Sequence, residues 1–199
     1  MARIFVAIAL LSSAAPARAA AQSAPAQPAP AHSWKRYAAG IVTSILAHEA
    51  GHVAASLLQG AHPTFGLNRG RPTIYSGIDP ITNPGQQFIF SSAGLNVQAA
   101  LDEGILDSPH NRGGSFERGV LAGGIATTAF YLTIGRTARV SDVAYMVRTS
   151  GLRPTGVALI YGGVALLHIV RIELSGHYAD FFVHPDVNTS ALRVGVNWR

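Results

Sequence analysis

Apolar and polar positions divide this chain into four apolar segments separated by polar stretches rich in glycine, proline and arginine. The apolar segments cover about residues 37–59, 88–101, 119–135 and 155–172. Because a helix needs roughly 17–25 apolar residues to cross a bilayer, the first, third and fourth segments are long enough to span one. The second is marginal and suits a re-entrant position. The pattern predicts an all-α, polytopic membrane protein with about three or four transmembrane helices.

Glycine positions refine this expectation. Gly60 directly follows the first segment, where a left-handed residue commonly ends a helix. Gly119 and Gly123 lie four residues apart in the third segment, a spacing that allows close helix packing. Residues 62–85, between the first two segments, are rich in glycine and proline and contain a short strand candidate at residues 73–75. We therefore expect a short β-rich loop after the first helix.

The N-terminal residues have the pattern of a secretory signal peptide. Arg3 precedes an apolar run, and Ala17 and Ala19 form an A-x-A cleavage site. An uncleaved anchor helix is the alternative, and both place the following residues on the far side of the membrane. The next stretch is rich in alanine and proline, a composition that forms no packed core. The predicted organisation is a signal peptide, a linker, a membrane-embedded domain and a C-terminal tail, at residues 1–19, 20–36, 37–175 and 176–199.

The composition supports the membrane assignment and limits the chemistry. Charged residues make up 13% of the chain and hydrophobic residues 48%, whereas soluble domains carry about 25% charged residues. The net charge of +5 comes from scattered arginines, which favours loops facing a bilayer and argues against nucleic-acid binding. Cysteine is absent, so a bound metal must be held by imidazole and carboxylate groups.

The basic residues also indicate an orientation. If the N-terminus starts outside, the first helix emerges inside near Gly60, and residues 136–153, with four arginines, lie inside as well. That agrees with the positive-inside tendency. Lys35 and Arg36, which would lie outside, disagree with it.

The first segment contains the motif H-E-x-x-H, formed by His48, Glu49 and His52. Residues four apart lie on one face of a helix, so the two imidazoles can bind one zinc ion. Glu49 can reach a zinc-bound water and act as general base, and zinc lowers the pKa of that water to about 7. Ionisable groups inside an apolar segment are costly in lipid, which indicates that they face a cavity and have a function.

With Gly51, these residues match H-E-x-G-H, and here the chain resembles the site-2 protease family of intramembrane zinc metalloproteases over about residues 41–167. The resemblance implies a zinc-dependent endopeptidase that cleaves a peptide bond in or near a membrane-spanning substrate. It implies a multi-pass protein of the bacterial inner membrane, with the lipid bilayer and a membrane protein or peptide substrate as partners. It also implies that the loop after the zinc helix accepts a substrate strand, and a plain connecting loop is the alternative. The oligomeric state is not indicated.

A catalytic zinc ion usually takes a third protein ligand. The bacterial branch of the family has an aspartate on a later helix, and the stretch around Asp142 is similar to it, which implies Asp142 as this ligand. Ser141 and Asp142 could instead simply begin a helix. A competing group has helical spacing and follows the fourth segment: Glu173, His177 and Asp180. A solvated face at the membrane edge is the alternative interpretation of that group.

Two further polar residues lie inside apolar segments. Asn96 follows Gly94 in a stretch similar to the family's Gly-Pro-x-x-Asn motif, which implies that its amide donates to the developing oxyanion. A hydrogen bond to another helix is the alternative. His168 could be a ligand, a proton relay or a hydrogen-bonded packing residue. Near the C-terminus, residues 192–198 alternate as in a peripheral strand.

Two other functions fit the same residues. One is a non-catalytic, metal-binding membrane scaffold of the same fold, for which metal binding without cleavage would be the evidence. The other is a soluble periplasmic zincin whose apolar segments are core helices. Extraction from membranes by salt or alkali alone would indicate the soluble protein.

Overall fold

The computed structural model describes residues 33–68, 70–110, 112–178 and 181–182. The elements are, in chain order, α1 (Trp34–Leu58), β1 (Thr64–Asn68), β2 (Arg71–Tyr75), α2 (Pro84–Asp107), α3 (Ser115–Leu132), η1 (Gly135–Thr137), α4 (Asp142–Ser150), α5 (Pro154–Leu174) and η2 (Gly176–Tyr178). The expected helical fold with a short β-rich loop is confirmed. The predicted signal peptide, most of the linker, Asp180 and the strand pattern at residues 192–198 lie outside the described residues.

Helix α1 carries the H-E-x-x-H motif and begins at Trp34, three residues before the predicted segment. Its start is fixed by Ser33, whose side chain accepts a hydrogen bond from the Arg36 amide at 3.4 Å. Such a cap satisfies one of the free amides at a helix N-terminus. At the other end, Gly60 adopts a φ of 72°, as predicted.

Helices α1 and α3 pack so closely that only glycine fits at their contact. A Cβ atom on Gly40 would lie 2.0 Å from the Phe116 carbonyl oxygen, and one on Gly119 would lie 2.0 Å from the Tyr37 carbonyl oxygen. Gly123 makes a similar approach to α1 one turn later. The predicted role of Gly119 and Gly123 in close helix packing is therefore confirmed.

Helix α2 is longer than the predicted segment at residues 88–101 and covers Pro84–Asp107. The difference has a physical reason. Several polar residues of α2, including Gln87, Gln98 and Asp102, are buried against the other helices and not exposed. A search for apolar residues therefore stops too early at both ends, because the interior of this protein is partly polar.

Two helices of the described part of the chain, α1 and α5, are long and apolar enough to cross a membrane. Helices α2 and α3 are not among them. Each helix has a most apolar stretch of 18 residues, and only 33% of that stretch is buried in α1 and 17% in α5. These two helices therefore expose large apolar surfaces, which include Leu46 on α1 and Leu159 and Leu174 on α5.

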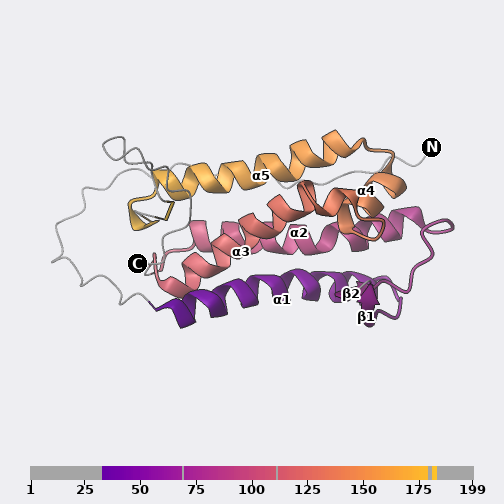
Figure 1. The fold of residues 1–199 in the computed structure, drawn as a ribbon, viewed down its shortest axis with the longest axis horizontal. Coiled ribbons are helices and arrows are strands. Elements are labelled where there is room, and N and C mark those ends of the chain that lie inside the picture. Colours follow the sequence, from indigo (N-terminus) through magenta and orange to yellow (C-terminus); the bar gives the residue numbers. More distant parts are fainter. Residues whose placement is uncertain (1–32, 69, 111, 179–180, 183–199) are drawn as a thin grey trace. The chain divides into compact units, whose positions relative to one another are not determined.

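The β-hairpin follows α1 and confirms the predicted strand at residues 73–75. Strands β1 and β2 are antiparallel, with Phe65 opposite Ile74, and Gly70 takes a φ of 80° at the turn between them. Helices α1, α2, α3 and α5 run side by side, and the hairpin and α4 lie near the end where α1 finishes (Figure 1). One apolar cluster, built around Leu95, Val143 and Val157, packs α4 against α2 and α5. This packing brings α4 close to the motif on α1.

Candidate metal centre

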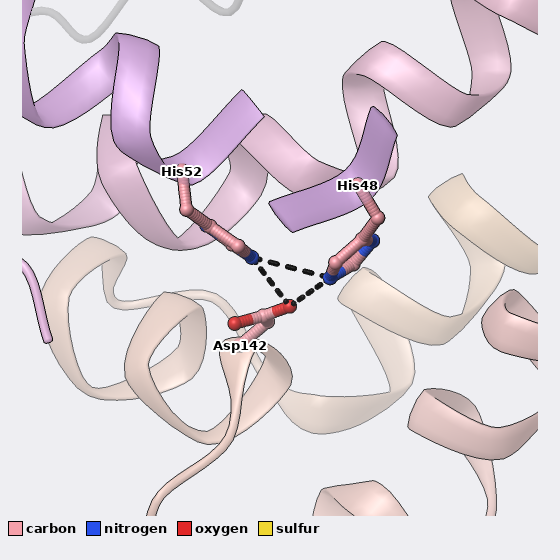
Figure 2. A group of neighbouring side chains, drawn as sticks. All are labelled: His48, His52 and Asp142. Carbon is pink, nitrogen blue, oxygen red and sulfur yellow. Dashed lines mark hydrogen bonds and ion pairs between the residues drawn. The ribbon is translucent and has the colours of Figure 1, made fainter. Parts of the chain in front are cut away.

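Three buried side chains converge between α1 and α4 (Figure 2). The Nε2 atoms of His48 and His52 lie 3.2 Å apart, and Oδ2 of Asp142 lies 3.1 Å from the first and 3.2 Å from the second. The exposed fractions are 2% for His48, 3% for His52 and 9% for Asp142. The structure thus brings together two residues one helical turn apart and a third that lies 90 positions further along the chain.

The orientation of each imidazole is fixed by a hydrogen bond from its other nitrogen. Nδ1 of His52 donates to the Phe90 carbonyl oxygen at 2.8 Å, and Nδ1 of His48 donates to Oε1 of Gln98 at 3.0 Å. The Gln98 amide nitrogen in turn donates to the hydroxyl and the carbonyl oxygen of Ser44, which sets the direction of the amide. Both histidines therefore direct Nε2 toward Asp142, as metal-binding histidines with outer hydrogen-bond partners do.

Local sequence positions Asp142 at the start of α4. Ser141 caps this helix by accepting a hydrogen bond from the Ala144 amide at 3.2 Å, so the interpretation of this pair as a helix start is also correct. Gly151 ends the helix with a φ of 73°. Val143 and Met146 anchor its buried face, and Asp142 consequently faces α1.

The charges at this cluster require a positive partner. Burial alone would raise the pKa of the Asp142 carboxyl, but hydrogen bonding and charge interaction with His48 and His52 outweigh burial and lower the pKa to about 2. The carboxylate is therefore ionised at neutral pH. Because each Nδ1–H is already donated, a neutral imidazole presents a lone pair at Nε2. Two lone pairs and a carboxylate oxygen about 3 Å apart repel one another unless a cation or added protons lie between them.

The donor atoms fit zinc. A tetrahedral ion with ligand distances of about 2.0–2.1 Å separates its ligand atoms by roughly 3.3 Å, and the three separations here are 3.1, 3.2 and 3.2 Å. Gly94 of α2 provides the necessary space, since a Cβ atom there would lie 2.6 Å from Nε2 of both histidines. A chain without cysteine offers the nitrogen and oxygen donors of a catalytic zinc site. The cluster can hold a metal ion.

A cavity of about 530 Å³ opens beside the cluster. Its lining includes Glu49, His52 and Asp142, together with consecutive residues of β2 and the loop after it. Glu49 is partly buried and carries the carboxylate nearest in sequence to the first histidine. Phe90, Phe130 and Tyr131 add aromatic walls. The cavity thus joins the metal centre, an additional carboxylate and a β-strand in one space.

Aromatic rings hold the imidazoles in place from the sides. The Tyr131 ring stacks on His48 with centroids 5.3 Å apart and planes inclined by 14°. The Phe90 ring lies 4.8 Å from that of His52. These contacts limit the rotation of both side chains, which a preorganised metal site needs.

The other predicted site residues lie elsewhere. Asn96 is exposed on α2, where its Oδ1 accepts a hydrogen bond from the Tyr161 hydroxyl at 3.0 Å. It does not line the cavity, and its role as an oxyanion donor stays a prediction. Glu173 and His177 are exposed near the end of α5 and do not belong to the three-residue cluster. His168 is buried beside Asp102 and Glu103 of α2.

Sequence reasoning did not assign two residues that the site depends on. Gln98 holds His48, and Gly94 leaves room for both imidazoles. Both lie on the buried face of α2. Their spacing of four residues is the feature of the sequence that places them on one face of a helix. A polar stripe with helical period inside an otherwise apolar segment indicates a face directed at polar partners.

No known protein family, curated protein or solved structure matches this chain. The function is therefore argued from the site itself.

Proposed function

We propose that this chain is a zinc-dependent endopeptidase that hydrolyses a peptide bond in or near a membrane-spanning substrate. The observation that supports it most strongly is the position of Asp142, whose carboxylate lies 3.1 and 3.2 Å from Nε2 of the two motif histidines. Three protein ligands and one side open to a cavity are the arrangement of catalytic zinc sites. The H-E-x-x-H motif alone provides only two of those ligands.

In the proposed reaction, His48, His52 and Asp142 hold zinc, which lowers the pKa of water and polarises the scissile carbonyl when bound. Glu49 accepts the proton from the attacking water and delivers it to the leaving amine. Its place on the cavity wall beside His52 suits this role. Gln98 and the Phe90 carbonyl keep the imidazoles oriented throughout.

The position of β2 supports an extended peptide as substrate. Residues 72–76 follow one another along the cavity wall, and an extended segment can add to a strand through main-chain hydrogen bonds. A transmembrane helix must unwind before its backbone becomes accessible to hydrolysis. The strand beside the metal centre would hold the unwound segment, and the apolar and aromatic lining suits residues that come from a membrane span.

The exposed apolar faces of α1 and α5 support association with a membrane, and we propose a multi-pass protein of the inner membrane. In a soluble zincin, helices this apolar would be mostly buried, whereas only 33% and 17% of their most apolar stretches are buried here. Helices α2 and α3 then cross beside them as the more polar, inner members of the bundle. Exposed arginines gather around α4, at the end predicted to lie inside: Arg136, Arg139, Arg148 and Arg153. Membranes washed with alkali would retain such a protein and release a soluble one.

Replacing Glu49 with Gln tests the proposal. The variant should keep one zinc ion per chain and lose cleavage of a single-span test protein by about 100- to 10,000-fold, the usual contribution of a general base. Zinc is measured by elemental analysis and cleavage by mass spectrometry of the products. Glu173→Gln, an equivalent change at an exposed position near the end of α5, is the control and should cleave normally. Cleavage by Glu49→Gln at the native rate would disprove the assignment.

The position of Asn96 favours a second candidate, a non-catalytic metal-binding membrane scaffold. Its amide is exposed and bonded to Tyr161, so the one residue predicted to stabilise an oxyanion does not face the cavity. The scaffold would bind zinc stoichiometrically and leave every single-span test protein intact. The same two measurements therefore distinguish the two functions.

A further inference from the structure

A second group of ionisable side chains lies between α2 and α5, away from the metal ligands. Nε2 of His168 lies 3.0 Å from Oε1 of Glu103, and Nδ1 lies 3.5 Å from Oδ2 of Asp102. His168 and Asp102 are each only 2% exposed. Both ring nitrogens of this buried histidine therefore face carboxylate oxygens.

This arrangement fits an imidazolium better than a neutral ring. A neutral imidazole has one N–H and one lone pair, so one of the two carboxylates would face a lone pair. Arg171 pairs with Glu103 and with the more exposed Asp107. No cation other than His168 is paired with Asp102 among the described residues. Charges buried in an apolar setting need a partner, and a protonated His168 provides one for Asp102.

The second oxygen of Asp102 provides an independent observation. Its Oδ1 is buried and has no hydrogen-bond partner among the described residues, and Asp102 lines a cavity of about 10 Å³ that Gln98 and His168 also line. Gly124 of α3 makes room for this carboxyl, because a Cβ atom there would lie 2.4 Å from Oδ2. A carboxylate with one unpartnered oxygen is costly in the interior, so its stability depends strongly on the charge of His168.

The cluster is linked to the metal centre through α2. Asp102 follows Gln98 by four residues and lies one helical turn away on the same buried face. Gln98 accepts the hydrogen bond from His48 and so fixes that ligand. A shift of α2 at Asp102 therefore moves the side chain that orients His48.

We propose that Asp102, Glu103 and His168 form a proton-binding site whose occupancy controls the metal centre. With the proton bound, His168 holds α2 and α5 together through both carboxylates. When the proton leaves, Asp102 and Glu103 face a neutral ring, and Arg171 is the remaining nearby cation. Asp102 and Glu103, which are neighbours on α2, then repel each other and lose the imidazolium of α5 that held them both, and α2 moves at Gln98. Glu103 has a side chain 32% exposed and connects the site with solvent for proton exchange.

The proton site can be observed without any enzymatic activity. In protein labelled with ¹⁵N-histidine, the ring nitrogens of His168 are assigned by their loss in His168→Gln. An isolated histidine releases half of its protons near pH 6.5. We expect both nitrogens of His168 to stay protonated at pH 7.5, about one pH unit above that value. An unprotonated nitrogen of His168 at pH 7.5 in the wild-type protein would overturn the proposal.

A charge-removing variant tests the control of the metal centre, a step that rests on the proposed function. Asp102→Asn should lower the midpoint of the His168 titration by about 1 to 3 pH units, since an opposite charge is lost. The pH at which cleavage activity is lost on the alkaline side should fall by the same amount, and the zinc content should stay unchanged. Asp107→Asn, a matched change on the same helix at a side chain 51% exposed, should move both much less.

The possible results separate the two proposals. In Asp102→Asn, the His168 titration could shift while the loss of cleavage at high pH stays at its wild-type position. That result would overturn the control of the metal centre by this site. Zinc-loaded wild-type protein without cleavage at any pH would disprove the protease, while the ¹⁵N titration would still decide whether the proton site exists.

Discussion

Asp142 and Glu117 are buried carboxylates that each lie beside histidine, and they differ in what completes them. At Asp142, two imidazoles face one oxygen, and a cavity adjoins the group. At Glu117 on α3, one oxygen accepts hydrogen bonds from His110 and from the Tyr178 hydroxyl. The other oxygen accepts from the Gly113 amide at 2.9 Å.

The difference shows what distinguishes a metal centre from a structural polar cluster. Glu117 accepts hydrogen bonds from the Tyr178 hydroxyl and the Gly113 amide, so each of its oxygens has a donor other than histidine, and it joins the loop before α3 to the residues after α5. Asp142 instead faces two nitrogens whose protons are directed elsewhere. Histidine beside a carboxylate is therefore not sufficient evidence for a metal. The presence of other donors to the carboxylate decides.

The largest effect is expected for Asp142→Asn. The amide cannot replace a charged ligand, so zinc affinity should fall by more than about 100-fold, because loss of an outer partner alone costs 10- to 100-fold. Elemental analysis of the purified variant and a cleavage assay measure the loss. Glu117→Gln serves as the matched control and should keep its zinc. Equal zinc loss in both variants would remove the distinction between the two clusters.

Glu117→Ala should have the next largest effect, on stability and not on metal. The change leaves the Tyr178 hydroxyl and the Gly113 amide without their acceptor, and each buried donor left unsatisfied costs about 1–3 kcal/mol. Denaturant unfolding in detergent micelles, followed by fluorescence, gives the free energy of unfolding. Gln86→Ala, at an exposed site of α2, should change it little. An unfolding free energy close to that of the wild type would show that the cluster does not hold the chain together.

A smaller loss is expected for Gln98→Leu. The residue keeps its volume but no longer accepts the hydrogen bond from His48, so zinc affinity should fall by about 10- to 100-fold while binding persists. Competition with a chelator measures the affinity. Gln86→Leu places the same substitution on an exposed position of α2 and should bind zinc normally. Undiminished affinity in Gln98→Leu would mean that the glutamine does not orient the ligand.

The smallest effect concerns the pH dependence of stability at His110. The Ser108 carbonyl and then the Glu117 carboxylate raise the pKa of His110 above its usual value. Its stabilising contribution is therefore fully present below the unfolded pKa of about 6.5 and disappears as pH rises through the higher folded value. His110→Gln should flatten the stability profile in this interval. Unfolding midpoints measured from pH 5 to 9 test it, and an unchanged profile would contradict the pairing.

The sequence predicts best what is encoded by local spacing. His48, Glu49 and His52 are one helical motif, Gly60 ends that helix, and Gly119 and Gly123 have the spacing of a close helix contact. Each of these depends on neighbours within a few residues. The family resemblance added Asp142, which lies 90 positions beyond His52 and which spacing alone does not single out.

The residues that the sequence analysis did not assign have partners on other helices. Gln98 is 50 positions from His48, and Asp102 pairs with His168 across α2 and α5. Their functions depend on how the helices meet. The polar interior of α2 also explains why this helix is longer than the predicted segment.

The glycine contacts between α1 and α3 have a consequence for how a substrate enters. With backbone atoms touching at Gly40 and Gly119, these helices have no side-chain layer that could rearrange, and separating them would open an empty gap. They form a fixed wall. The hairpin closes the cavity from another side and makes few contacts with α1, whereas α4 is packed against α2 and α5 and carries Asp142. Admission to the cleft thus depends on the hairpin at its rim, and the long helices serve as the frame against which it moves.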